Sequence, residues 1–593
     1  MFRTKKLAIL AVVVMIASIV LAACGPTPEP VVIKETSVVV ETVVVEVEGE
    51  AVVQEVTSVV EKEVVVTATP EPEPTEPPKA ELEGLWYRIT TEPPTLDIQL
   101  ANDTTSHLII GQCIEGLFHY RADGSFEPTG ATGYTVSDDG VVYTITLRED
   151  SVWSDGVPVV AQHYVDGIIR LLEPETAAEY AWLMYDIKGA AAFNTGETDD
   201  PSTVGVRALD DYTLEVELEG PRSYFETVLP FSTFYPTRVD IIEQYGDQWT
   251  EPGNYVSNGP YLLDSWEHEA EVVLVKNPDY WDADNVTIEK VTIPIIAEDA
   301  TSLALFENDE LHVSGYPSED VPRIVEDPIL SEELRITPRP GIYYIGLNTQ
   351  RPPTDNVLVR QALAAAIDRQ SIIDNVIQMP WRRPMSCSTP PDVLGYQEYG
   401  TCGWAFDLDK AKELLAEAGY PDGEGFPVLE MWFNRADFNE DVIEAVAAMW
   451  EENLGISVEL RTNEWAVYQD YLNACNDSKE SLAACEFNAY RMGWVMDYGD
   501  PQNQLQVLFD PRSPQQYMGW ESPRFEELID QAGASFDTAE REALYKEADK
   551  ILCEEEAGLI PLLSYDNSTL VKNGVTFEFP PFGSPSFKYW ELP

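Results

Sequence analysis

A single stretch of this chain is continuously apolar, and it limits where the rest of the chain folds. Leu7–Ala22 is an uncharged run of 16 residues that follows Arg3, Lys5 and Lys6. A helix that spans a bilayer needs about 20 such residues, so the run fits an export signal better than a permanent membrane segment. We therefore expect residues 1–23 to be a signal peptide and the remainder to fold outside the cytoplasm.

The signal ends in Leu21-Ala22-Ala23-Cys24-Gly25, which resembles a bacterial lipobox. Signals of that kind are cleaved before the cysteine, and the freed thiol is acylated. The alternative is an ordinary cleavage site beside a chance cysteine. We expect lipidation of Cys24, which would anchor the protein to the outer face of the bacterial cytoplasmic membrane, in the cell envelope or periplasm.

Residues 24–80 follow as a low-complexity segment. Between Gly25 and Ala80 there are 17 Val, 12 Glu and 8 Pro, and there is no aromatic residue. Such a segment has nothing large to bury against the entropy that ordering would cost, so we expect a lipid-anchored linker. Pairing of its Val-rich part, Ser37–Val66, as β-structure is left open.

The chain as a whole is strongly acidic, with 104 Asp+Glu against 37 Lys+Arg and a net charge of −67. Nucleic acid is excluded as a partner, because its binding needs clustered Lys and Arg against the phosphates. Most of the excess belongs to residues 81–593, where we expect a solvated acidic surface. A salt-adapted exterior and a cation-attracting cleft are the alternatives.

The folded part alternates irregularly between strand and helix patterns, which indicates an α/β class. Tyr134–Leu147 is typical of a hairpin that turns at Asp139-Gly140, and Asp407–Ala418 of a capped helix. No nucleotide-binding, nucleophile or zinc motif occurs, and all five His precede residue 313. We therefore expect no enzyme, no cofactor and no metal.

Six cysteines remain after Cys24, in an oxidising compartment. Cys387 and Cys402 flank one loop and Cys475 and Cys485 another, so local pairing within each loop is the simplest expectation. The other two, Cys113 and Cys553, could pair across the fold, but we expect buried thiols.

Several ordered segments together resemble one family, the extracellular solute-binding proteins of family 5, which are the peptide- and oligopeptide-binding lipoproteins of ABC importers. The resemblance runs from about residue 85 to 575. It is carried by Glu92–Asp97 (EPPTLD), Cys113–Phe118 (CIEGLF), Val136–Gly140 (VSDDG), Val152–Val159 (VWSDGVPV), Asn258–Tyr261 (NGPY), Lys276–Trp281 (KNPDYW), Val359–Leu363 (VRQAL), Ala366–Arg369 (AIDR), Lys410–Leu415 (KAKELL) and Glu417–Tyr420 (EAGY).

This resemblance implies a periplasmic-binding-protein-like fold of two α/β lobes that close on a ligand about a hinge, with an additional third domain in the first lobe. The hinge is expected near residues 341 and 565. The implied segments are 82–117, 237–341 and 566–593 for the first lobe, 118–236 for the additional domain II, and 342–565 for the second lobe (domain III).

The resemblance also implies ligand-binding residues in the second lobe. In Gly493-Trp494-Val495-Met496-Asp497-Tyr498, Asp497 matches the family aspartate that holds a peptide α-ammonium. Arg491 matches an arginine for the peptide carboxylate, and Arg435 falls where dipeptide-binding relatives place theirs. Trp465 matches a tryptophan that lines a side-chain pocket. The structural alternatives are an ion-paired loop aspartate, a surface arginine and a core tryptophan.

On the opposing lobe, Asn102 and Thr104 align with the family's binding segment, although their neighbours depart from its pattern. The ligand-binding set is therefore Asp497, Arg491, Arg435, Trp465, Gly493, Trp494, Val495, Asn102 and Thr104.

The expected function is capture of short peptides, roughly two to five residues at about 3.3 Å per residue, by a monomer that delivers them to ABC permease subunits. Arg435 would serve the shortest peptides and Arg491 the longer ones. Alternatives within the family are an oligosaccharide, an opine or a metal complex. The alternative of another class is a secreted hydrolase that acts on peptides, for which no nucleophile–base set is present.

Overall fold

The computed structural model describes residues 31–47, 50–66, 82–477, 482–513 and 515–593. It divides into two compact units, Met1–Lys79 and Ala80–Pro593. The expected signal peptide and Cys24 lie outside the described residues. Among the described residues, no helix combines the length and apolar character that crossing a membrane requires.

The Val-rich segment forms a hairpin. Strand β1 (Val31–Val47) pairs antiparallel with β2 (Glu50–Val66), in an unbroken register from Val31 opposite Val66 to Val47 opposite Glu50. Val is β-branched and favours extended backbone, so this composition supports paired strands. The sequence left open whether Ser37–Val66 pairs as β-structure, and the structure shows that it does.

The second unit contains three larger sheets. The first, which marks what we call the first lobe, is four-stranded in the order β10-β11-β12-β3. Its strands are β3 (Leu85–Trp86), β10 (Tyr261–Glu267), β11 (Glu271–Lys276) and β12 (Lys290–Pro294). Helix α2 (Thr104–Cys113) packs against β10. The neighbouring helices are α7 (Asp299–Glu307), α8 (Val321–Glu326) and α9 (Leu330–Glu333).

A second four-stranded sheet is antiparallel, in the order β6-β7-β9-β8. Its strands are β6 (Ala131–Val136), β7 (Val142–Leu147), β8 (Val206–Asp210) and β9 (Thr213–Glu217). Pairing of β6 with β7 confirms the expected hairpin, and Gly140 in its turn has φ 73°. Helix α3 (Ala161–Leu172) packs on β8 and β9, and the short strands β4 (Phe118–Tyr120) and β5 (Phe126–Pro128) pair separately.

The third sheet, which marks the second lobe, has six strands in the order β13-β18-β14-β17-β15-β16. They are β13 (Val313–Ser314), β14 (Leu334–Leu347), β15 (Leu429–Asn434), β16 (Val458–Asn463), β17 (Ala489–Val495) and β18 (Leu559–Val571). The helices are α10 (Val357–Ala365), α11 (Arg369–Ser371), α12 (Leu408–Glu417), α13 (Asp437–Leu454), α14 (Trp465–Asp477), α15 (Gln502–Phe509), α16 (Pro523–Ala534) and α17 (Thr538–Lys550). Helix α12 confirms the expected helix, since Asp407 caps it through Lys410 N.

Alternate residues of this sheet pack into two different cores. Ile345 on β14 and Phe433 on β15 belong to the cluster that contains Val442 and Trp450 of α13. Their chain neighbours Tyr344 and Trp432 belong to the opposite cluster. This period of two is the pattern of a sheet covered on both faces.

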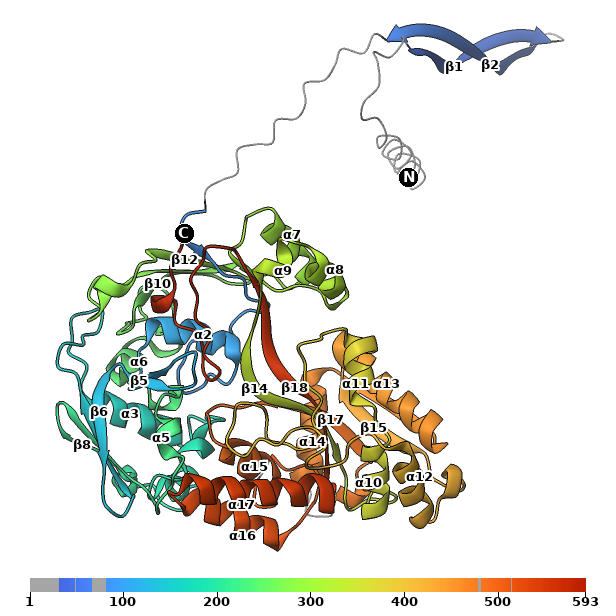
Figure 1. The fold of residues 1–593 in the computed structure, drawn as a ribbon. Coiled ribbons are helices and arrows are strands. Elements are labelled where there is room, and N and C mark those ends of the chain that lie inside the picture. Colours follow the sequence, from blue (N-terminus) through green and yellow to red (C-terminus); the bar gives the residue numbers. More distant parts are fainter. Residues whose placement is uncertain (1–30, 48–49, 67–81, 478–481, 514) are drawn as a thin grey trace. The chain divides into compact units, whose positions relative to one another are not determined.

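Two long strands connect the sheet to the first lobe. β14 and β18 pair antiparallel over most of their length, and Figure 1 shows them running from the side of α7–α9 toward β17. Their register shifts twice, between Pro338 and Ile342 and between Tyr343 and Tyr344. Pro338 lies opposite Asp566 and Ile342 opposite Ser564, so three residues of β14 face the single residue Tyr565.

Candidate ligand-binding site

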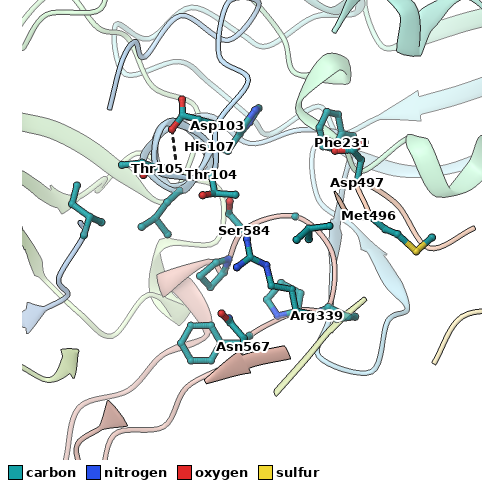
Figure 2. A pocket seen from close by; sticks show the side chains of 18 of the residues that line it. Asp103, Thr104, Thr105, His107, Phe231, Arg339, Met496, Asp497, Asn567 and Ser584 are labelled. Atoms are coloured by element: carbon teal, nitrogen blue, oxygen red, sulfur yellow. Dashed lines mark hydrogen bonds between the residues drawn. The ribbon is translucent and has the colours of Figure 1, made fainter. Parts of the chain in front are cut away.

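A cavity of about 360 Å³ lies beside the N-terminal turn of α2 and the end of β17. Figure 2 shows its walls. They are built from residues 87–90 after β3, from 102–108 at the start of α2, from Tyr180 and Phe231, from Arg339, from 495–497 at the end of β17, and from Asn567 and 579–585. We refer to this cavity as the pocket.

Asp497 supplies a carboxylate to the pocket wall. Asn503 Nδ2 donates to its Oδ2 at 3.0 Å, and the Tyr180 hydroxyl donates to its Oδ1 at 3.2 Å. Burial raises the pKa of Asp497 to about 6, although both hydrogen bonds act to lower it. The group is thus ionised at neutral pH, and no cation of the protein within the described residues forms a salt bridge with it. A ligand ammonium suits this position.

The backbone at the end of β17 is fixed by one side chain at the start of α15. Asn503 Oδ1 accepts hydrogen bonds from Trp494 Nε1 at 2.9 Å and from Asp497 N at 3.0 Å. The same amide donates to the Asp497 carboxylate, so all three bonds hold the carboxylate in place. Sequence analysis did not single out Asn503. Its position six residues after Asp497, at a helix start, was the available signal.

The first lobe contributes the N-terminal turn of α2. Asp103 caps the helix, since its Oδ1 accepts from Thr105 N and Ser106 N at 2.9 Å each. Its Oδ2 has no hydrogen-bond partner among the described residues. Thr104 lines the pocket, and so does Asn102, whose amide donates to Glu179.

One wall of the pocket is aromatic. The ring of His107 lies 6.4 Å from that of Tyr180 and 5.7 Å from that of Phe231. Burial lowers the pKa of His107, so its imidazole is neutral at neutral pH. This wall offers apolar surface and a neutral ring nitrogen.

Two arginines line the pocket, and sequence analysis missed both. Arg88 is fully engaged: Nε donates to Ile296 O at 2.7 Å, Nη2 to Ala297 O at 3.1 Å, and Nη1 pairs with Asp299 at 2.7 Å. Arg339 lies in the register break of β14. The prolines on both sides of Arg339, which cannot donate to a ladder, were the signal in the sequence.

Comparison with known proteins settles the family. The family model of bacterial extracellular solute-binding proteins, family 5 (middle), matches residues 125–516. The chain belongs to family 5 of the bacterial extracellular solute-binding proteins. The resemblance found in the sequence is thereby confirmed.

The curated relatives in family 5 cover most of this chain. The oligopeptide-binding protein OppA of Bacillus subtilis is 36% identical over 485 residues, which are 79% of this chain and 86% of that protein. The probable deoxycholate-binding periplasmic protein YgiS of Escherichia coli is 33% identical over 500 residues, 82% and 89% of the two chains.

Solved structures of family 5 match the fold. The murein tripeptide-binding protein MppA of E. coli has a TM-score of 0.73 at 28% identity, covering 86% of this chain and 99% of its own. Haemophilus influenzae OppA in complex with RPPGFSPFR has a TM-score of 0.72 at 26% identity and covers 86% and 99%. The expected α/β two-lobe fold is confirmed, and so is the expectation that this family 5 member is a binding protein and not an enzyme.

The structure brings together only part of the ligand-binding set that the family 5 resemblance implied. Asp497, Val495, Asn102 and Thr104 line the pocket. The remaining five do not: Arg491, Arg435, Trp465, Gly493 and Trp494. Trp494 acts on the pocket indirectly, through its bond to Asn503.

Arg491 lies behind the pocket wall, buried and mostly satisfied. Its Nη1 donates to Asn434 Oδ1 at 2.9 Å and its Nη2 to the Tyr565 hydroxyl at 3.0 Å, while Nε has no partner. The guanidinium lies 4.2 Å from the centroid of the Tyr343 ring. Gly493 is required beside it, because a Cβ at this position would overlap the Tyr565 hydroxyl.

Arg435 and Trp465 lie at the surface of the second lobe. Arg435 pairs with Glu464 at 3.2 Å, and the two side chains are 59% and 71% exposed. Trp465 is 44% exposed at the start of α14, and its ring lies 6.2 Å from that of Tyr468. Neither residue is a core residue or a pocket residue in this conformation.

The cysteines follow the expected pattern. Cys387 is bonded to Cys402 and Cys475 to Cys485, with Cα–Cα distances of 5.7 and 6.0 Å. Cys113 and Cys553 are free and buried. Cys387, Asp549 and Cys553 lie close enough to hold an ion, but Cys387 is in a disulfide and Asp549 accepts hydrogen bonds from Ser388 and Thr389. Their donor atoms are therefore already engaged.

Proposed function

We propose that this protein is an extracytoplasmic substrate-binding lipoprotein, which captures short peptides between its lobes and delivers them to the permease of an ABC importer. The observation that carries the proposal is Asp497, an ionisable carboxylate in the pocket wall that has no cationic partner in the part of the chain that the structure describes. A peptide α-ammonium supplies the missing cation. The oligopeptide- and murein peptide-binding proteins among the relatives support peptides as the ligand class.

In this proposal, the paired strands β14 and β18 form the hinge about which the lobes close on the peptide. The register break opposite Tyr565 lies where a hinge was expected, near residues 341 and 565. A ligand that contacts both sides of the pocket stabilises the closed conformation by a population shift. We assign the first lobe to 82–117, 237–341 and 566–593, the additional domain to 118–236, and the second lobe to 342–565.

Calorimetry with paired peptides tests the ligand class. Trialanine with a free amine should bind to the wild-type protein, whereas N-acetyl-trialanine should bind about 100-fold more weakly, because an unpaired buried carboxylate costs about 3 kcal/mol. Asp497→Asn should abolish the difference between the two peptides. Equal affinity of the wild type for both peptides would reject the role of Asp497.

The native ligand is identified by native mass spectrometry of the protein as purified. The expected outcome is the mass of a peptide of roughly two to five residues, at about 110 Da per residue. The expected length assumes an extended peptide, which advances about 3.3 Å per residue. A sterol, sugar, opine or metal-complex mass would replace the peptide proposal with a non-peptide solute. One relative is named a probable deoxycholate-binding protein, so a bile acid belongs in that comparison.

We infer that Cys24 anchors the protein, since the sequence around it resembles a lipobox. Cys24→Ala should leave an unprocessed or soluble product in the bacterial host. The measurement is partition into the detergent phase after Triton X-114 extraction. Partition that does not change on substitution would reject the lipid anchor without affecting the peptide proposal.

A further inference from the structure

Arg339 is a half-buried cation, and among the described residues no anion is fixed on it. Among the described residues, no hydrogen bond or salt bridge reaches its guanidinium, in contrast to Arg88 in the same pocket. Burial lowers the pKa of Arg339. Removing a charge from water is costly unless an opposite charge replaces the solvent. Among the described residues, no carboxylate forms a salt bridge with Arg339, although Asp103 and Asp497 line the same pocket.

The backbone directs Arg339 into the pocket. Three residues of β14, Arg339 to Gly341, stand opposite Tyr565 alone, and pairing resumes at Ile342. Bulges of this kind bend a strand and re-aim a side chain. Figure 2 shows the Arg339 side chain entering the pocket near Ser584 and Asn567.

Asp566 is an acidic group that acts on Arg339 and raises its pKa. Both residues line a smaller cavity of about 170 Å³. The Asp566 carboxylate pairs with Arg382 at 3.1 Å, and the side chains of Arg382 and Asp566 are 11% and 10% exposed. Because Asp566 is paired with Arg382, an anion for Arg339 alone would have to come from the contents of the larger pocket.

We propose that Arg339 binds a carboxylate of the ligand, so that the pocket recognises the ligand's cation at Asp497 and its anion on the hinge strand. Arg suits this role because its planar fork binds a carboxylate bidentately. The inference rests on the proposed peptide function. It assigns to Arg339 the carboxylate-binding role that the family resemblance implied for Arg491 and Arg435. The Arg491 guanidinium is bonded to Asn434 and Tyr565, and that of Arg435 to Glu464.

The position of Arg339 gives this contact a second consequence. Because β14 connects the two lobes, a carboxylate held there makes contact with the hinge itself. Ligands with and without the carboxylate should then differ in how strongly they favour the closed conformation, as well as in affinity.

The test is a double-mutant cycle by titration calorimetry. The ligands are trialanine and its C-terminal amide, together with the amides of Ala-Glu-Ala and Ala-Gln-Ala to probe a side-chain carboxylate. The proteins are the wild type, Arg339→Gln and Arg339→Lys. Arg335→Gln is the matched control, because Arg335 lies on the same strand, outside the pocket, and donates to backbone carbonyls.

If Arg339 binds the C-terminal carboxylate, amidation of trialanine should weaken its binding to the wild type about 10- to 100-fold. This is the range for one charge-assisted contact. Amidation should have no effect on Arg339→Gln and an intermediate effect on Arg339→Lys. For recognition of a side-chain carboxylate, the Glu and Gln peptides should differ in the wild type and bind equally to Arg339→Gln. Either pattern supports the inference and identifies the source of the carboxylate.

Three outcomes overturn the inference. The inference is overturned if the wild-type protein binds trialanine and its amide equally and also binds the Glu and Gln peptides equally. This result counts even if Arg339→Gln does not fold. An Arg339→Gln variant that folds by circular dichroism yet retains the full wild-type discrimination overturns it as well. Wild-type protein that binds none of these peptides overturns it together with the proposed function, so failure of Arg339 alone remains distinguishable.

Discussion

The Tyr180 hydroxyl donates a hydrogen bond of 3.2 Å to Asp497 Oδ1, although the two residues are 317 positions apart in the chain. Tyr180 precedes a short turn of helix, Ala181–Met184, and Asp497 follows β17. This bond places a neutral donor from one segment against the carboxylate of another. The tyrosine thus contacts the oxygen that a ligand ammonium would contact.

Binding of amine ligands should depend on pH through Asp497. The pKa of this carboxyl is about 6, and an ammonium needs the ionised form. Affinity for trialanine should therefore be highest near pH 7 and fall through pH 6, by about tenfold between pH 7 and pH 5. It should fall again from about pH 8 upward, because the peptide α-amine, with a pKa of about 7.7–8.0, then loses its proton. Calorimetry at pH 5, 6, 7 and 8 measures this profile. Asp497→Asn should give weak binding with no such step, and a step in that variant would assign the titration to another group.

Asp497→Asn should also stabilise the ligand-free protein at neutral pH. An unfolded aspartate titrates near pH 3.9, below the folded pKa of about 6. Folded protein thus binds more protons between these values, and stability falls as the pH rises through them. The variant avoids this cost, so its free energy of unfolding at pH 7.5 should rise by about 1–3 kcal/mol, with no gain near pH 3.5.

Urea denaturation at both pH values measures this effect, and Asp500→Asn is the contrasting variant. Asp500 is buried and pairs with Arg541 at 2.5 Å. Its replacement leaves a buried guanidinium unpaired, which should destabilise the protein by about 3 kcal/mol. Destabilisation by Asp497→Asn at pH 7.5 would show that the carboxylate is satisfied in the folded protein.

Tyr180→Phe should shift the pH profile upward. The tyrosine hydroxyl is one of the two side-chain donors that lower the pKa of Asp497. Its removal should raise the binding midpoint by about 0.5–1 pH unit, equal to about 1 kcal/mol. Tyr185→Phe is the control, because that hydroxyl donates to Asn194 at 2.6 Å away from Asp497. Identical midpoints for the wild type and Tyr180→Phe would contradict the shift.

The length dependence of binding tests the two arginines chosen from the sequence. If each arginine binds the carboxylate of peptides of a different length, Arg435→Ala should weaken the binding of dipeptides most. Arg491→Ala should weaken the binding of longer peptides most. To bind a dipeptide, Arg435 would have to break its ion pair with Glu464. Breaking an ion pair at the surface costs at most about 1 kcal/mol. Glu464→Gln should therefore strengthen dipeptide binding up to about fivefold if Arg435 is the anchor. Calorimetry that shows no change for dipeptides would leave Arg435 as a surface residue.

Removing the Cys387–Cys402 disulfide should lower stability without changing peptide affinity. The bond closes a loop with a sequence separation of 15, for which loss of the crosslink costs about 3 kcal/mol by chain entropy. Thermal unfolding of a Cys387→Ser/Cys402→Ser double variant measures it. Loss of peptide affinity in folded protein would show that the loop shapes the site.

Local patterns in the sequence were sufficient for several elements. The Asp139-Gly140 turn signal located the β6–β7 hairpin, and the Asp407 cap located α12, because each depends on residues close together in the chain. Ordered motifs were sufficient for the family and the two-lobe fold. They also selected Asp497, Asn102 and Thr104, which the structure brings to one pocket.

Sequence patterns thus established the fold class and one anionic residue of the site, whereas the state of the charged groups depends on long-range packing. Arg491, Arg435 and Arg339 are the same residue type, and only long-range packing distinguishes them. Asn434 and Tyr565 satisfy Arg491 from 57 and 74 positions away, whereas a bulge against β18 leaves Arg339 free in the pocket. Burial likewise sets the pKa of Asp497. Periodicity and turn chemistry act over a few residues, but desolvation and ion pairing depend on neighbours that only the completed fold supplies.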